Sequence, residues 1–318
     1  MTNDIIEDVT NYVLQCNADI YIYTGGIDRN IQTLRELICA HPDKKDEVDL
    51  FLTTYGGDPE WSYRLMSILR KYYTKINVII PGLCKSAGTL IAFGADTLRF
   101  HKYGELGPLD VQMKRKDNVL GYNSGLDVFQ SLSVINDTAA DCFNKMFVNF
   151  ILKGGGSIST ETAAKIAKDL SVGIYSSVAS KIDPLELGEK NRAMRIAEMY
   201  GLQLTSLTKT PNAKPDTLNR LIGDYPSHGF VIDMEQAKNL FVNVEDMTEN
   251  DYKIYEIYKD VMNNPNSITI HDLSYQIKQS NIITKDYQND CETIKATVIE
   301  AEKTPISFSV GKKRGKSK

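Results

Sequence analysis

One serine stands where a strand would turn into a helix, and it is the first candidate for chemistry. Residues 81–89 read PGLCKSAGT, and they follow an apolar run that predicts a β-strand. Ser86 therefore lies in the turn before a helix of small residues. The positive end of that helix dipole would stabilise a developing oxyanion. The alternative is a structural role, in which the Ser86 hydroxyl only caps the helix.

A glycine pair, Gly56-Gly57, ends the preceding predicted strand just before another helix. Backbone N–H groups without side-chain cover can act as oxyanion-hole donors. The alternative is a tight turn that needs positive φ. In parallel sheets the carboxyl ends of the strands form one edge, where ligands bind. The glycine turn and the serine turn are therefore expected at the same edge of one sheet.

Short motifs in a fixed order resemble the Clp protease/crotonase superfamily. They are Gly56-Gly57-Asp58, then Lys85-Ser86-Ala87-Gly88-Thr89, then Leu106-Gly107-Pro108-Leu109-Asp110. Within the superfamily, the chain is most similar to the serine dehydrogenase proteinase family, relatives of the signal peptide peptidases. Residues 182–188 and 225–238 carry that closer resemblance, which covers about residues 15–245.

The resemblance implies an α/β fold of the Clp protease/crotonase type. Such a fold has repeated ββα-type units, a mostly parallel central sheet and flanking helices. It also implies an ATP-independent serine endopeptidase that needs no cofactor and acts on peptides or unfolded proteins. Ser86 matches the nucleophile, and Gly57 and Ala87, with Gly56 beside them, match the oxyanion hole. A homo-oligomer is expected by the same resemblance.

The general base is left open by the sequence. A serine needs a basic partner, because its own pKa is far too high for reaction at neutral pH. Clp proteases use a His with an Asp, whereas signal peptide peptidases use a Lys. His228 and Lys181 are the two candidates here, and His101 is a weaker one. If they are not catalytic, the His228 imidazole is expected to pack against its own turn, and the Lys181 ammonium is expected to lie in solvent.

Two other functions fit parts of the pattern. A crotonase-type enzyme acting on an acyl thioester would use the same oxyanion turns with a carboxylate base, for which Glu105 is nearest in sequence. A non-catalytic peptide-binding scaffold would use Ser86 only as a helix cap. No segment matches a phosphate loop, a dinucleotide fingerprint or a metal-binding spacing.

The elements that must position these residues alternate along the first 100 residues. Apolar runs predict strands, and helical spacing predicts helices between them, which indicates a parallel sheet. The strands are expected at 19–23, 48–52, 76–80 and 97–100, and the helices at 30–40, after Pro59 and at 86–93.

The later elements are mostly helical. They are expected as a helix over 126–152 interrupted near Asn136-Asp137, helices over 159–170 and 188–204, a strand over 230–232, and helices over 234–241 and 247–262. We expect a peptidase domain over residues 1–245 and a helical extension with a basic end over 246–318.

Composition excludes some classes of protein. The 318 residues hold 37 Lys and Arg against 41 Asp and Glu, a net charge of −4, which argues against a nucleic-acid binder. Five scattered cysteines without C-x-x-C spacing fit a reducing compartment. No segment has the length and apolarity of a membrane span or signal peptide, so a cytoplasmic protein is expected.

Overall fold

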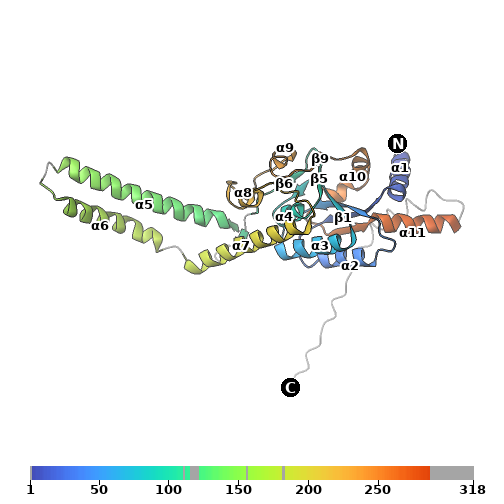
Figure 1. Ribbon diagram of the computed structural model, residues 1–318, viewed down its shortest axis with the longest axis horizontal. Helices are drawn as coiled ribbons and strands as arrows, with labels where there is room; N and C mark the ends of the chain where they lie inside the picture. The colour runs from blue at the N-terminus through green and yellow to red at the C-terminus, as the bar shows by residue number, and fades with distance from the viewer. Residues whose placement is uncertain (1, 110–111, 115–121, 155–156, 181–182, 287–318) are drawn as a thin grey trace, which may run out of the picture.

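A six-stranded sheet forms the centre of the molecule (Figure 1). The computed structural model describes residues 2–109, 112–114, 122–154, 157–180 and 183–286. The strand order is β10-β1-β2-β3-β5-β9, in which only the β10–β1 pair is antiparallel. The strands are β1 (Ala18–Thr24), β2 (Glu47–Thr53), β3 (Lys75–Ile80), β5 (Thr97–Phe100), β9 (Val244–Asp246) and β10 (Thr269–Asp272). The mostly parallel sheet expected from the alternating pattern is confirmed.

Helices cover both faces of this sheet, and the strands are apolar on both sides for that reason. Along β1, Tyr21 and Tyr23 enter the core on one face, whereas Ile20 and Ile22 enter the core on the other. One face carries α2 (Ile31–Ala40), α3 (Pro59–Tyr72) and α4 (Ala87–Phe93). The other face carries α1 (Thr2–Gln15), α10 (Glu249–Met262) and α11 (Leu273–Asp286).

Several short strands and helices follow the carboxyl ends of the central strands, where the predicted catalytic turns lie. β4 (Leu83–Cys84) pairs in parallel with β6 (Glu105–Leu106), and β7 (Gln112–Lys114) pairs with β8 (Tyr122–Ser124). The predicted strand over 230–232 is wrong as a strand. Only an isolated antiparallel bridge forms there, between Leu106 and Ile232, because the β6 partner is itself only two residues long. Two short helices, α8 (Thr217–Gly223) and α9 (Met234–Ala237), come later in the chain, before β9.

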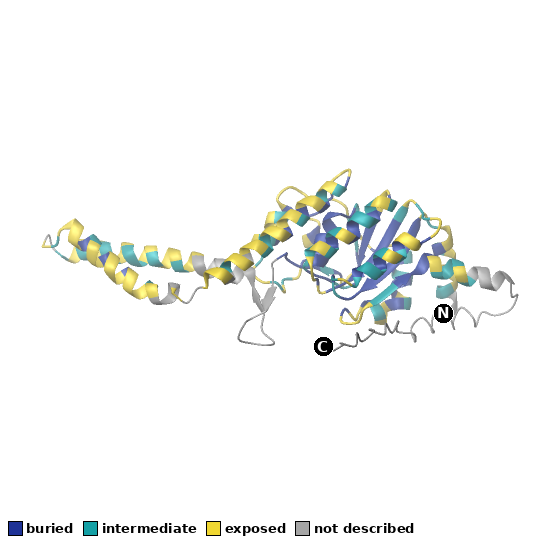
Figure 2. Cartoon of the chain, turned by 90° about the horizontal axis from the view of Figure 1, so that it is seen from below, coloured by how far each residue is buried: buried dark blue, intermediate teal, exposed yellow. Residues whose placement is uncertain are grey.

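A helical arm projects from the sheet body (Figures 1 and 2). It consists of α5 (Gly125–Lys153) and α6 (Thr160–Ala179), and α7 (Pro184–Leu207) returns the chain to pack against α3 and α4. The interruption expected at Asn136-Asp137 is wrong, because α5 is continuous. Asn and Asp lower helix propensity by less than about 1 kcal/mol each. Ser133 Oγ donates to Asp137 Oδ2 one turn later (3.3 Å), and α5 packs along α6.

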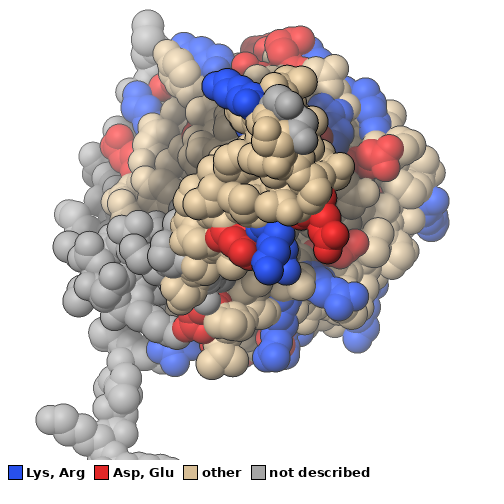
Figure 3. Space-filling view, turned by 90° about the vertical axis from the view of Figure 1, so that its left-hand side faces the viewer, with Lys and Arg blue, Asp and Glu red and all other residues tan. Residues whose placement is uncertain are grey.

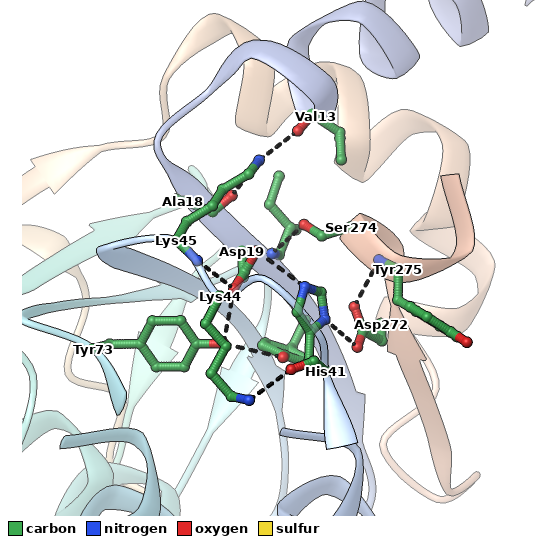
Figure 4. Close-up of polar contacts among 12 residues, drawn as sticks. Val13, Ala18, Asp19, His41, Lys44, Lys45, Tyr73, Asp272, Ser274 and Tyr275 are labelled. Atoms are coloured by element: carbon green, nitrogen blue, oxygen red, sulfur yellow. Dashed lines mark hydrogen bonds and ion pairs between the residues drawn. The ribbon is translucent and has the colours of Figure 1, made fainter. Parts of the chain in front are cut away.

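A buried ion cluster fastens β10 to the amino end of β1 (Figure 4). His41 donates from Nδ1 to Asp272 Oδ2 (2.7 Å), and its Nε2 lies 3.3 Å from Asp19 Oδ1. Tyr73 donates its hydroxyl to the other Asp19 oxygen (3.0 Å). Burial opposes the charge on His41, but the two carboxylates raise the pKa of the imidazole to about 9. The cluster lies at the opposite edge of the sheet from the serine and glycine turns.

Residues after 245 contribute to the sheet as well as to its helical cover. β9 and β10 are strands that the sequence did not predict, whereas α10 falls within the helix expected over 247–262. A capping box starts α10, because Thr248 Oγ1 accepts from Asp251 N–H while Asp251 accepts from Thr248 N–H. No helix among the described residues combines the length and the apolarity needed to span a membrane.

Candidate active site

Ser86 occupies a strained turn between β4 and α4. Its φ of 49° and ψ of −113° lie in a region that residues with a Cβ rarely adopt. The side chain makes no capping hydrogen bond, although Ser86 is at the N-cap position of α4. The hydroxyl is half-buried and has no hydrogen-bond partner within the described part of the chain. Strain of this kind is found at functional sites, and a capping role does not account for it.

The glycine turn lies directly against the serine turn, as the strand order predicts. Thr54 N–H donates to Leu83 O (2.7 Å), and Lys85 N–H donates to Thr54 O (3.0 Å). Gly56 has a φ of 105°, and a Cβ there would lie 2.7 Å from the Ser86 Cβ. Only glycine therefore fits at position 56 without moving the serine.

Two backbone N–H groups in the glycine and serine turns have no protein acceptor among the residues that the structure describes. They belong to Gly57, the second residue of the glycine turn, and to Ala87, the first residue of α4. The N–H of Gly56 differs, because it donates to Thr54 Oγ1 (2.9 Å). Gly57 also has a positive φ of 148°, and a Cβ there would lie 2.2 Å from Ile27 O. Ala87 directly follows Ser86, and Gly57 directly follows Gly56, which lies against the Ser86 Cβ, so these two N–H groups are the candidate oxyanion donors.

Lys85 points away from Ser86 and binds the neighbouring segments. Its ammonium forms an ion pair with Glu105 Oε1 (2.8 Å) and donates to Leu106 O (3.0 Å) and Phe230 O (3.3 Å). The side chain is buried. It ties the serine turn to β6 and to the loop before α9. Glu105 is therefore engaged by an adjacent cation, which disfavours it as the carboxylate base of a thioester enzyme.

The candidate bases lie in different surroundings. His228 is half-buried in the loop between α8 and α9, two residues before Phe230, and it does not hydrogen-bond to Ser86. Lys181 lies outside the described residues. His101 is buried among aromatic rings, with its ring centroid 4.4 Å from that of Tyr255. Burial is the main cause that lowers the pKa of His101. A packing role for His101 is consistent with these contacts.

Two buried hydroxyls fix α4 in place, and neither belongs to a motif that is recognisable from the sequence. Ser62 Oγ, on α3, donates to Ala87 O (2.7 Å). Thr89 Oγ1 donates to Gly107 O (2.8 Å) and accepts from Gly107 N–H (3.1 Å). Their signal in the sequence is a lone hydroxyl on an otherwise apolar helix face. The described residues hold no group of three or more His, Cys, Asp or Glu side chains placed to bind a metal ion.

Comparison with known proteins gives a family match. Residues 18–183, just over half of the chain, match the sequence model of the ClpP-like SDH-type serine proteinases. An uncharacterized protein of Methanocaldococcus jannaschii is 30% identical over 135 residues, which is 41% of this chain and 46% of that protein. The chain thus spans less than half the length of that relative.

Two further proteins are more distant. A second uncharacterized protein of Methanocaldococcus jannaschii is 24% identical over 256 residues, covering 80% of this chain and 72% of that protein. Among solved structures, a mutant of the 1510-N membrane-bound stomatin-specific protease aligns with a TM-score of 0.30 and 15% identity. That alignment covers 46% of this chain and 68% of that chain.

Proposed function

Because the chain belongs to the ClpP-like SDH-type serine proteinase family, we propose that it is an ATP-independent serine endopeptidase with Ser86 as its nucleophile. The observation that carries the proposal is the strained Ser86 turn, packed against the glycine turn, with two backbone N–H groups in these turns that no described residue accepts from. A serine that only capped α4 or packed in the core would need neither the strained backbone nor the free N–H groups. Peptides or unfolded proteins are the proposed substrates, and no cofactor takes part.

The proposed reaction has two acyl-transfer steps. Ser86 Oγ loses its proton to a base and attacks the peptide carbonyl carbon, whose oxygen becomes an oxyanion. The N–H groups of Gly57 and Ala87 stabilise that oxyanion, and Gly56 lets the two turns approach closely enough to place both donors. The C–N bond breaks as the amine takes the proton. Water, deprotonated by the same base, then hydrolyses the acyl-enzyme.

His228 and Lys181 remain the proposed bases. For His228, the supporting observation is the Lys85–Phe230 hydrogen bond, because it holds the His228 loop beside the serine turn. Catalytic hydrogen bonds are often long before substrate binds, so the missing Ser86–His228 bond is compatible with this role. For Lys181, which lies outside the described residues two positions before the α7 N-cap Asp183, the support is the resemblance to the signal peptide peptidases, which use a Lys.

The test compares the parent chain with Ser86→Ala and with the control Ser206→Ala, which changes an exposed hydroxyl on α7. A fluorophosphonate probe and an unfolded protein substrate report the nucleophile and the turnover separately. We expect Ser86→Ala to lose probe labelling and at least about 10³-fold of the cleavage rate, and Ser206→Ala to keep both. Equal cleavage by parent and Ser86→Ala would refute the mechanism. A parent that is neither labelled at Ser86 nor able to cleave the substrate would indicate a peptide-binding scaffold.

A further inference from the structure

Thr54, which directly follows β2, is fully buried and contacts the serine turn on two sides. Its backbone is hydrogen-bonded to β4, because its N–H donates to Leu83 O (2.7 Å) and its O accepts from Lys85 N–H (3.0 Å). Its methyl group packs against α4, since a Cβ added at Gly88 would lie 2.5 Å from Thr54 Cγ2. Thr54 therefore joins the end of β2 to both segments that flank Ser86.

The Thr54 hydroxyl binds the first N–H group of the glycine turn. Gly56 N–H donates to Thr54 Oγ1 (2.9 Å), so this buried amide has an acceptor two residues earlier in the chain. On the other side of the turn, Ile27 N–H donates to Gly56 O (2.8 Å), and Asp58 N–H donates to Ile27 O (2.7 Å). The N–H groups before and after Gly57 are thus both engaged. The Gly57 N–H between them has no acceptor among the described residues.

The direction of the Gly57 N–H depends on these neighbouring contacts. Gly57 N–H and Gly56 O belong to one planar peptide group and point in opposite directions, because no peptide bond of the described chain is cis. Ile27 N–H binds the oxygen end of this group, so the N–H end points away from Ile27. Glycine adopts many backbone conformations, so a turn of two glycines keeps one orientation only where other groups hold it. The Thr54 hydroxyl holds the preceding amide.

We propose that Thr54 is a positioning residue, whose hydroxyl fixes the glycine turn so that Gly57 N–H points at the oxyanion. This role rests on the proposed peptidase function. Thr54 is buried, so it acts through Gly56 and does not itself contact the substrate. The negative charge on the carbonyl oxygen develops only as Ser86 attacks, so a misplaced donor raises the barrier to acyl transfer more than it weakens substrate binding. Loss of the hydroxyl should therefore lower kcat and leave KM nearly unchanged.

The test replaces the Thr54 hydroxyl with a methyl group of similar size. Thr54→Val removes the acceptor of Gly56 N–H but keeps a methyl group against Gly88, whereas Thr54→Ser keeps the acceptor and removes the methyl group. Steady-state cleavage of an unfolded protein substrate gives kcat and KM, and fluorophosphonate labelling gives the reactivity of Ser86. We expect Thr54→Val to lower kcat and the labelling rate by about 10- to 100-fold with KM within about threefold of the parent, and Thr54→Ser to restore kcat to within about threefold.

Two control variants separate positioning from stability. Thr24→Val removes a buried hydroxyl at the end of the adjacent strand β1, where Thr24 Oγ1 donates to Ser267 O (2.8 Å). It should lower the urea midpoint of unfolding about as much as Thr54→Val does, but keep the parent kcat. Thr138→Val changes an exposed hydroxyl on α5 of the helical arm, whose end faces the viewer in Figure 3, and it should match the parent in every assay.

A loss of kcat without a loss of substrate binding is the result that a purely structural role of Thr54 does not explain. The proposal is overturned if Thr54→Val keeps the parent kcat, loses no more kcat than Thr24→Val, or raises KM at constant kcat. If Thr54→Val does not fold, Thr54→Ser and Thr54→Ala replace it, because both lack the methyl group and differ only in the hydroxyl; equal kcat values would then overturn the proposal. A parent that neither cleaves the substrate nor is labelled at Ser86 would instead refute the peptidase function itself.

Discussion

Gly56→Ala tests most directly whether the two turns form one site. The change adds a single carbon atom on the glycine turn and leaves Ser86, Gly57 and Ala87 chemically intact. That carbon would lie 2.7 Å from the Ser86 Cβ, 2.9 Å from Lys85 O and 3.2 Å from Ala87 N. All three neighbours belong to the serine turn, and two of them are backbone atoms. The turns must therefore move apart.

The size of the effect follows from these distances. Ordinary contacts of a Cβ begin at 3.4 Å, so the Ser86 carbon must retreat by about 0.7 Å (3.4 − 2.7). A misplacement of about 1 Å at a reacting group costs about 10²-fold in rate. Alanine at a φ of 105° adds roughly 1–3 kcal/mol of backbone strain. We expect probe labelling of Ser86 to slow by about 10²-fold and the free energy of unfolding to fall by about that strain.

The assay measures the second-order rate of fluorophosphonate labelling, together with urea unfolding on the same samples. Gly82→Ala is the matched control, because Gly82 lies in the turn between β3 and β4 and has no atom within 4 Å of an added Cβ. It should label at nearly the parent rate. If folded Gly56→Ala labels as fast as Gly82→Ala, the glycine turn does not position Ser86, and the oxyanion hole assigned to Gly57 and Ala87 is refuted.

Two further predictions concern buried charges. Lys85→Met removes the cation that joins the serine turn to Phe230, so we expect slower labelling of Ser86 and a loss of about 2 kcal/mol in unfolding free energy, with partial rescue by Lys85→Arg. Unchanged labelling would rule out a positioning role. The pKa of folded His41, about 9, is above the usual 6.5, so its stabilisation is complete below pH 6.5 and is lost as pH rises through 9. The free energy of unfolding from urea titrations should differ between pH 6.5 and pH 10 by on the order of 3 kcal/mol in the parent and by much less in His41→Asn. An equal pH dependence in the two proteins would refute the stabilising role of charged His41.

The sequence predicts those strands, helices and turns whose conformation depends on residues close together in the chain. Apolar runs predicted the ends of β1, β2, β3 and β5 to within two residues, because parallel strands buried on both faces consist almost entirely of apolar residues. Pro59 begins α3 as expected, since proline suits the first turn of a helix. The turns at Gly56 and Ser86 follow from those elements, because parallel strands end at one edge.

The parts that the sequence did not predict depend on distant pairing. β10 is a four-residue strand, and it forms because β1 offers an unpaired edge and because His41 binds Asp272 across 231 positions. Nothing local in the sequence around Thr269 marks that pairing. The expected break at Asn136-Asp137 failed for the opposite reason, since the packing of α5 along α6 outweighs a weak local preference.

The same distinction explains why the base is harder to assign than the nucleophile. Ser86 is held by its own turn and by the fit against Gly56. The Ser62 hydroxyl donates to Ala87 O, and the Thr89 hydroxyl joins α4 to Gly107. His228 belongs to a loop that reaches this turn through the hydrogen bond from Lys85 to Phe230. A base on such a loop can move into reach as substrate binds, whereas Ser86 and the two proposed N–H donors belong to turns that are already fixed. Substrate binding should therefore change the surroundings of the base far more than those of Ser86.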